Sequence, residues 1–327
     1  MGMGMSMEMG QSQEQRLSQE QRLILQLAQE LKQRIGQLEK QVLEKAQFPG
    51  IDLSDDGSQY HLEMLRTLLV RASEGENSLV GDVLSKNNLK IEDVQKIIIE
   101  SFEMADISQG IGTQRDVDLV TVVFDEDKQF VMTVSLDKEY FKKQDDSPSY
   151  KEAQILKKLN PETDWFAQRF FGAKKIVSRK KDGGIRFLVC KEYLDGLMLG
   201  NITSNLDMID SLSSDPETAA DPAERKKIEA VAYAVGKMLT NALTSVGGVP
   251  KDSHNANIIY MEDEEGKITC RYCDVEGILT DQGGIGRQIK QLFTEFGPVA
   301  DIVEKGLTEN YDGPILKAIL EEIKGGK

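Results

Sequence analysis

Apolar residues along the chain follow first a helical period, then the pattern of strands, and then a helical period again. Between residues 24 and 42 they recur at steps of three and four, which predicts an amphipathic helix with heptad-like spacing. Further short helices are predicted over 62–69, over 80–84 and from 91 onward, the last carrying Ile97 to Ile99. Residues 11–100 therefore form a predicted helical N-terminal region, after a disordered tail at 1–10.

From about residue 101 the pattern is typical of strands. Residues 119–124 and 130–136 are apolar on either side of an acidic turn, as in a β-hairpin. Two more strands are predicted at 170–176 and 184–190, after a helix at 149–159. Helical periodicity then returns over 223–245, which Asp221-Pro222 begins and Gly247-Gly248 ends, and over three shorter helices at 287–296, 299–306 and 314–323 that follow a glycine-rich link. The pattern predicts an α+β protein.

Polar residues that could carry chemistry gather between residues 247 and 280. Asp252, His254 and Asn257 form an Asp-x-His-x-x-Asn cluster, which precedes a predicted hairpin with strands at 258–260 and 268–273. Asp274 follows that hairpin. A hairpin returns the chain to its starting point, so two carboxylates and an amide are expected at one place. Carboxylate and amide oxygens suit Mg²⁺, and another carboxylate can orient or deprotonate a hydroxyl group.

This order resembles the catalytic loop and the metal-binding turn of the kinase-like fold, in which the Asp and Asn of the catalytic loop are also five residues apart. The Asp-x-His-x-x-Asn form is most similar to atypical members, which include aminoglycoside and choline phosphotransferases, phosphoinositide kinases, HipA-type kinases and ubiquinone-associated kinases. The chain departs from them at Pro250, where the small-molecule phosphotransferases carry His, and in Asp274-Val275-Glu276-Gly277, which is one residue longer than Asp-Phe-Gly.

The resemblance covers about residues 101–325 and implies a bilobed protein-kinase-like fold. A small antiparallel-sheet lobe with its hinge would occupy 101–196, and a helical large lobe would occupy 197–327. ATP and Mg²⁺ would be the cofactors, with Asp252 as the catalytic base and Asn257 and Asp274 as metal ligands. His254 is a second catalytic candidate, although bracing of the loop is the preferred interpretation.

The resemblance also implies which residues would contact the nucleotide. These are Gly110 and Gly112 in a shortened glycine-rich loop, Glu152 in the C-helix, and Glu192, Tyr193 and Leu194 in the hinge that meets the adenine edge. Thr133 stands where the phosphate-binding strand lysine belongs. Either Lys128, Lys138 or Arg115 supplies the missing positive charge, or nucleotide binding is weak or absent.

Three interpretations remain open at this stage. The first is a phosphotransferase that acts on a small hydroxyl-bearing molecule or an unusual protein substrate. The second, favoured by Thr133, is a pseudokinase that serves as a nucleotide-sensing or protein-binding regulatory module. The third is another α+β domain whose likeness to kinases is coincidental.

The composition of the chain limits which binding partners and which cellular compartment are expected. Forty basic residues against fifty-five acidic ones give a net charge of −15, so neither nucleic acid nor an anionic membrane is an expected partner. No apolar run is long enough to span a membrane and no signal peptide opens the chain, so a cytoplasmic protein is expected. The cysteines Cys190, Cys270 and Cys273 fit a reducing compartment, and the last two are expected to be buried strand residues rather than a zinc or redox site.

The amphipathic helix over 24–42 has two possible roles. Either it packs on the rest of its own chain, or it binds a protein partner or a second copy of the chain as a coiled coil. Two to three heptads are short for an independent coiled coil, so both roles stay open.

Overall fold

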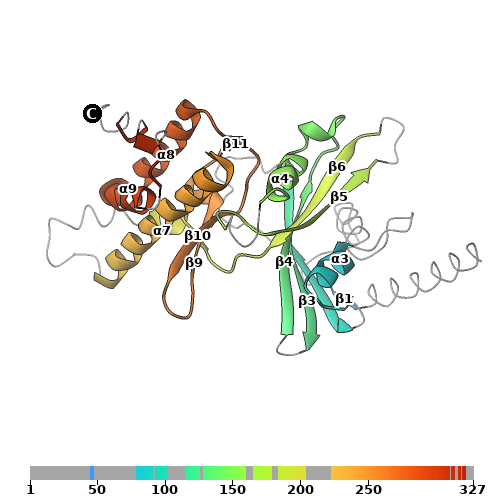
Figure 1. Ribbon diagram of the computed structural model, residues 1–327. Helices are drawn as coiled ribbons and strands as arrows, with labels where there is room; N and C mark the ends of the chain where they lie inside the picture. The colour runs from blue at the N-terminus through green and yellow to red at the C-terminus, as the bar shows by residue number, and fades with distance from the viewer. Residues whose placement is uncertain are drawn as a thin grey trace, which may run out of the picture.

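The structure is a computed structural model that describes residues 45–47, 79–90, 93–101, 115–125, 128–159, 165–178, 183–203, 222–309, 311–313, 316–317 and 319–321. The predicted tail, the helix over 24–42, Gly110 and Gly112 lie outside these residues. The described residues form a mixed α+β fold with a sheet lobe and a mostly helical lobe, each around its own hydrophobic core (Figure 1).

The sheet lobe is built on six strands in the order β1-β2-β3-β4-β6-β5. Their bounds are Ala46–Gln47, Lys96–Ser101, Arg115–Asp125, Lys128–Asp137, Ile185–Glu192 and Phe170–Val177, in that spatial order. All neighbours are antiparallel except β1 and β2, which are parallel. Helix α4 (Pro148–Leu156) lies between β4 and β5 in the sequence. The predicted hairpin, the helix after it and the two later strands are confirmed.

The segment from Lys96 to Ser101 is a strand, so the predicted helix that carries Ile97 to Ile99 is wrong. Three consecutive β-branched residues have stiff side chains that suit a pleated strand better than a helix. Ile97 pairs with Val122 and Ile99 with Val120, and both isoleucines are fully buried. The sheet therefore begins on the N-terminal side of the predicted boundary at residue 101.

The two faces of the sheet differ in chemistry because side chains alternate along each strand. One face is apolar and packs with helix α3 (Leu79–Lys86) into one core; it includes Val120, Val122, Met132, Val134, Leu188 and Cys190. The other face carries polar groups near α4. Thr133 of β4 lies opposite Lys191 of β6 in the register, and Arg115 of β3 lies opposite Asp137. Directly opposed residues share a face, so both cations point to the side of α4.

A buried carboxylate fixes the start of α4. Asp137, fully buried, accepts hydrogen bonds from Ser147 Oγ at 2.6 Å, the Ser149 N–H at 3.1 Å and the Phe187 N–H at 2.9 Å. Ser147 is also the N-cap of the helix, since its hydroxyl accepts from the Tyr150 N–H. These bonds tie α4 to β4 and β6, and they set the position of Glu152 one turn further along.

The second lobe is organised around α7 (Pro222–Val246), which packs against α9 (Ala300–Thr308) and strand β10. A three-stranded sheet has the order β10-β9-β7, with bounds Ile268–Tyr272, Ile258–Glu262 and Leu197–Met198. The predicted hairpin over 258–273 is therefore confirmed. Strands β8 (Val249–Pro250) and β11 (Ile278–Leu279) pair beside it.

Helix α8 (Gln282–Phe296) begins earlier than its sequence pattern predicts. Asp281 is its N-cap, and its carboxylate accepts a hydrogen bond from the Gly284 N–H at 2.7 Å. The predicted glycine-rich link at 283–286 is therefore the first turn of a helix, because a good cap offsets the low helix propensity of glycine.

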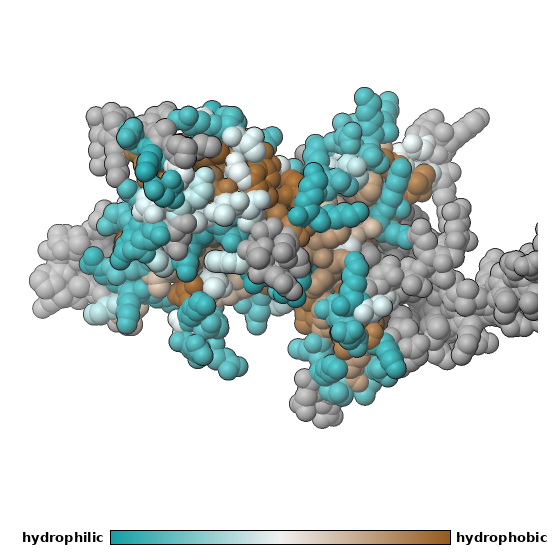
Figure 2. All heavy atoms as spheres, in the orientation of Figure 1, coloured by the Kyte–Doolittle hydropathy of each residue, from teal (hydrophilic) through white to brown (hydrophobic). Residues whose placement is uncertain are grey.

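In the view of Figure 2, hydrophilic side chains cover much of the described surface, and hydrophobic side chains gather near the junction of the two lobes. None of the described helices combines the length and the hydropathy needed to cross a bilayer.

Candidate active site

Asp252 and Asn257 lie in the loop between β8 and β9, and Asp274 follows β10. The three residues therefore lie at the same end of the β9–β10 hairpin. The Asn257 side-chain amide donates to the backbone carbonyl of Asp252 at 3.1 Å. The Cys273 N–H donates to the carbonyl of Asn257 at 3.0 Å, and Asp274 follows directly. The three predicted residues are therefore neighbours in space, although Asp252 and Asp274 are far apart in the sequence.

The same loop is held by three side chains from two other elements, α8 and β10. The Ser253 N–H donates to Gln288 Oε1 of α8 at 2.8 Å, and the Tyr272 hydroxyl of β10 donates to Ser253 Oγ at 2.9 Å. The Asn255 N–H donates to Glu295 Oε2 of α8 at 3.0 Å. Burial raises the pKa of the Tyr272 phenol well above its usual value, so the hydroxyl stays protonated and remains a donor. The loop is therefore preorganised rather than free.

His254 braces the loop and contacts Asp252. Its Nδ1 accepts a hydrogen bond from the Ala256 N–H at 3.1 Å, so in the neutral ring the proton is on Nε2. Nε2 lies 3.5 Å from Asp252 Oδ2. The side chain of Asp252 is 67% exposed, which leaves its carboxylate accessible to an incoming hydroxyl group. This geometry agrees with bracing, the preferred interpretation of His254.

A buried network of charges lies between the sheet lobe and Asp274. Lys191 Nζ is 2.8 Å from Glu152 Oε1, and Arg115 Nη1 is 2.5 Å from Glu152 Oε2. Arg115 Nη2 also pairs with Asp274 Oδ2, and with Glu276 Oε1 at 3.1 Å. The side chains of Glu152, Arg115 and Lys191 are each less than 10% exposed. Glu152 of the C-helix-like α4 is thus bound by two cations at once.

The network holds more negative than positive charge. Three carboxylates, of Glu152, Asp274 and Glu276, face two cations. Burial by itself would lower the pKa of Arg115, but the three carboxylates more than offset it, so the pKa lies above its usual value. Burial, and then the charge of Asp274, raise the pKa of Glu276. An additional cation beside Asp274 would relieve this repulsion.

Thr133 carries no charge, and the cations of this network are Arg115 and Lys191. Of the three cations weighed from the sequence, Arg115 is the one in the network, because Lys138 pairs with Asp116 at 3.4 Å and Lys128 lies over the Phe124 ring. Sequence reasoning missed Lys191. The signal for it was a lysine directly after the apolar run Phe187–Cys190 of a buried strand, where a charge needs a partner.

Glu192, Tyr193 and Leu194, the residues of the predicted hinge, differ in burial and in hydrogen bonding. The Glu192 N–H donates to the Arg169 carbonyl at 2.9 Å, and the Glu192 carbonyl accepts from Gln168 Nε2 at 2.7 Å. The N–H and the carbonyl of Glu192 are therefore both hydrogen-bonded within the protein. Leu194 is buried, and burial raises the pKa of the Tyr193 phenol.

Metal-binding groups are sparse. Within the described ranges, no three His, Cys, Asp or Glu side chains are placed to hold a metal ion. Cys270 and Cys273 are free and buried, and burial raises the pKa of the Cys273 thiol to about 12. These are the properties of buried structural cysteines, not of thiolate ligands; Cys270 lies in β10, whereas Cys273 follows the end of that strand. Mg²⁺ needs only one or two protein ligands when phosphates and water complete its shell.

Asp274 and Asn257 each offer an oxygen that suits Mg²⁺. Asp274 Oδ1 is buried, and no hydrogen-bond donor reaches it from the described residues. Asn257 uses its amide nitrogen on the Asp252 carbonyl, so its side-chain oxygen is the atom not used in that bond. The residues present therefore fit a hard divalent cation.

No protein-family model matches the chain, and no curated protein sequence matches it. Among solved structures, "WaaP in complex with acyl carrier protein" matches with a TM-score of 0.40 and 11% identity, over 65% of this chain and 84% of that chain. A TM-score of 0.40 marks a coarse likeness of fold, so we base the proposed function on this chain's own residues.

Proposed function

We propose that the chain is an ATP- and Mg²⁺-dependent phosphotransferase that acts on a small hydroxyl-bearing molecule or an unusual protein substrate. The observation that carries the proposal is the meeting of Asp252, Asn257 and Asp274 at one end of the hairpin, next to the Arg115–Glu152–Lys191 network. Phosphoryl transfer relies on positioning and on neutralising phosphate charge. This site would position the reacting groups, and because its carboxylates outnumber its cations, a bound Mg²⁺ would supply the additional positive charge.

Asp252 would orient the acceptor hydroxyl group and take its proton. Its carboxylate is exposed, and its backbone is fixed by the bond from Asn257. His254 would hold the loop through the bond that its Nδ1 accepts from the Ala256 N–H, because its Nε2 lies 3.5 Å from Asp252 Oδ2 and forms no hydrogen bond with a described residue. A general base needs a fixed direction more than a buried position.

Arg115 and Lys191 would supply positive charge where the phosphates of the nucleotide bind. They come from β3 and β6, on either side of β4, whose Thr133 carries no charge. Asn257 and Asp274 would hold Mg²⁺ through their side-chain oxygens. When bound, Mg²⁺ would neutralise charge on the transferred phosphoryl group.

A pseudokinase is the second candidate function, and a specific observation favours it. Arg115 Nη2 already pairs with Asp274 Oδ2, so one oxygen of the proposed metal ligand is neutralised within the protein. A regulatory module could keep this pair and bind nucleotide without turning it over. The two candidates differ in turnover, not in fold.

Three carboxyl-to-amide variants test the proposal in the full chain. Mg²⁺-ATP is expected to raise the melting temperature of the wild type, and Asp274→Asn to abolish the Mg²⁺-dependent part of that shift. Asp252→Asn is expected to keep the shift but to lower ADP formation at least about 100-fold, the lower range for loss of a general base. Glu264→Gln, an exposed carboxylate at the far end of the same hairpin, is the control and is expected to change neither.

The outcomes separate the candidates. Binding of Mg²⁺-ATP without ADP formation in the wild type would favour the pseudokinase. The absence of any stabilisation by Mg²⁺-ATP in the wild type would contradict both.

A further inference from the structure

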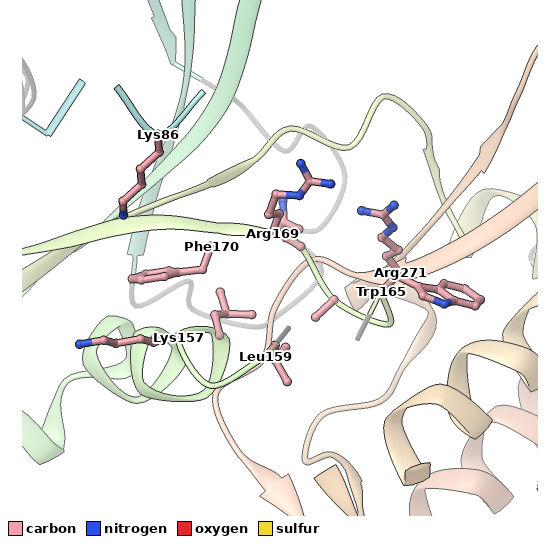
Figure 3. A pocket seen from close by; sticks show the side chains of 10 residues that line it. Lys86, Lys157, Leu159, Trp165, Arg169, Phe170 and Arg271 are labelled. Atoms are coloured by element: carbon pink, nitrogen blue, oxygen red, sulfur yellow. The ribbon is translucent and has the colours of Figure 1, made fainter. Parts of the chain in front are cut away.

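A separate pocket lies where α4 ends, beside the segment that leads into β5 (Figure 3). Its volume is about 300 Å³, and its lining includes neither Asp252, Asn257 and Asp274 nor the Arg115–Glu152–Lys191 network. Four of its lining residues are cations, namely Lys86, Lys157, Arg169 and Arg271. Four cations around one small pocket are unexpected in a chain whose net charge is −15.

Most of this positive charge is not neutralised within the described part of the chain. Arg271 Nη1 pairs with Glu192 Oε2 at 2.7 Å. Lys86 Nζ donates to the Phe171 carbonyl at 3.0 Å, a bond that leaves its charge uncompensated. Lys157 and Arg169 are exposed, and no described carboxylate forms an ion pair with either. Three positive charges therefore remain around the pocket.

Apart from Gln168, the rest of the lining is apolar and aromatic. Leu156 and Ala167 are buried, and Trp165 and Phe170 are half-buried. In Figure 3, Phe170 lies between the two lysines on one side and Arg169 on the other, with Arg271 and Trp165 beyond. A pocket of this size with an apolar floor and a few polar groups is at the lower limit for a small ligand.

We infer that this pocket binds a small molecule that carries a phosphate group. A phosphate group near neutral pH carries between one and two negative charges, which the three uncompensated cations can neutralise, and arginine binds phosphate through two parallel hydrogen bonds. A small anion responds to the local charge within the Debye length of about 8 Å, so the acidic remainder of the surface does not repel it as it would a polymer.

The pocket joins two elements of the candidate active site. Lys157 follows the last residue of α4, the helix that carries Glu152. The Arg169 N–H donates to Glu192 Oε2 at 3.1 Å, at the end of the hinge strand β6. A bound phosphate would contact the end of the helix and the hinge together. Binding itself does not depend on the proposed phosphotransferase activity.

Trp165 allows a direct test, because it is the chain's single tryptophan and it lines the pocket. The full chain is titrated with pyrophosphate in EDTA at constant ionic strength, and the emission of Trp165 is followed. We expect a saturable change. Lys157→Gln and Arg169→Gln are each expected to weaken binding about tenfold, the loss of one charge-assisted hydrogen bond. Lys158→Gln, an exposed neighbour outside the lining, is the control and is expected to leave binding unchanged.

Several results would overturn the inference. These are an unsaturable response, the same affinity in Lys157→Gln/Arg169→Gln as in the wild type, or citrate binding as tightly as pyrophosphate. None of these readouts needs ATP or turnover, so failure here is distinct from failure of the proposed function.

Discussion

Glu152 is the carboxylate that two buried cations share, so Glu152→Gln should be among the most costly single changes in this protein. Its side chain is 1% exposed, and its oxygens lie 2.8 Å from Lys191 Nζ and 2.5 Å from Arg115 Nη1. At an effective dielectric constant of about 20, charges 2.8 Å apart attract by about 6 kcal/mol, and desolvation offsets much of this. We expect the free energy of unfolding to fall by about 3 kcal/mol, as for a buried charge that loses its partner.

The network also predicts an asymmetry between the two partners. Lys191→Met should cost less than Glu152→Gln, because Glu152 keeps Arg115 when Lys191 is removed. Glu152→Gln leaves the Lys191 ammonium with neutral acceptors, the Gln amide oxygen and the Cys273 carbonyl at 2.9 Å, and without its carboxylate partner among the described residues. In the double variant the ammonium is absent, so its cost should be smaller than the sum of the two single costs by about 2 kcal/mol.

Urea unfolding of the four proteins, followed by circular dichroism and by Trp165 emission, measures this coupling. The surface pair Lys227–Glu262 is a matched control, since its Nζ–Oε2 distance is 2.7 Å but both side chains are more than 40% exposed. Its coupling is expected to stay below about 1 kcal/mol. The reasoning is refuted if the buried coupling is no larger than that of the surface pair, or if Lys191→Met costs more than Glu152→Gln.

Two further predictions concern pH and helix packing. Burial and then the charge of Asp274 raise the pKa of Glu276 in the folded protein above 4.5. Protonated Glu276 therefore stabilises the folded state fully below pH 4.5, and this stabilisation is lost as the pH rises through the folded-state pKa. Glu276→Gln should therefore gain stability relative to the wild type as pH rises from 4.5 in urea unfolding, and a difference that is constant with pH would contradict this. Gly236→Ala would place a Cβ atom 2.3 Å from the Val303 carbonyl oxygen where α7 meets α9, and should cost about 1–3 kcal/mol. Gly283→Ala is the control, since its added Cβ atom would have its nearest neighbour 3.6 Å away, and it should cost nothing. Thermal melts of both variants measure the difference, and equal melting temperatures would argue against the close contact at Gly236.

Local pattern was sufficient for several elements. The hairpin of β3 and β4 and the hairpin of β9 and β10 each show two apolar runs around an acidic turn, and α7 has a cap, a long apolar period and a glycine end. These signals act over a few residues, so the sequence predicts them without knowledge of the rest of the chain. The same locality allowed the position of Asp274 beside Asn257 to be predicted, because a single hairpin separates them.

Tertiary pairing decided what local pattern left open or predicted wrongly. Ile97 to Ile99 suit either a helix or a strand by burial alone, and the neighbouring strand β3 selects the strand. The glycines at 283–286 are helical because Asp281 caps them.

The charge that replaces the strand lysine was also decided by long-range contacts. Arg115 and Lys191 meet Glu152 from 37 and 39 residues away, and Arg115 reaches Asp274 across 159 residues. No spacing rule along the chain encodes such a meeting, because which cation reaches a carboxylate depends on strand order and register. The sequence by itself determined the residues capable of the chemistry, and the order of the sheet decided which of them share one buried site.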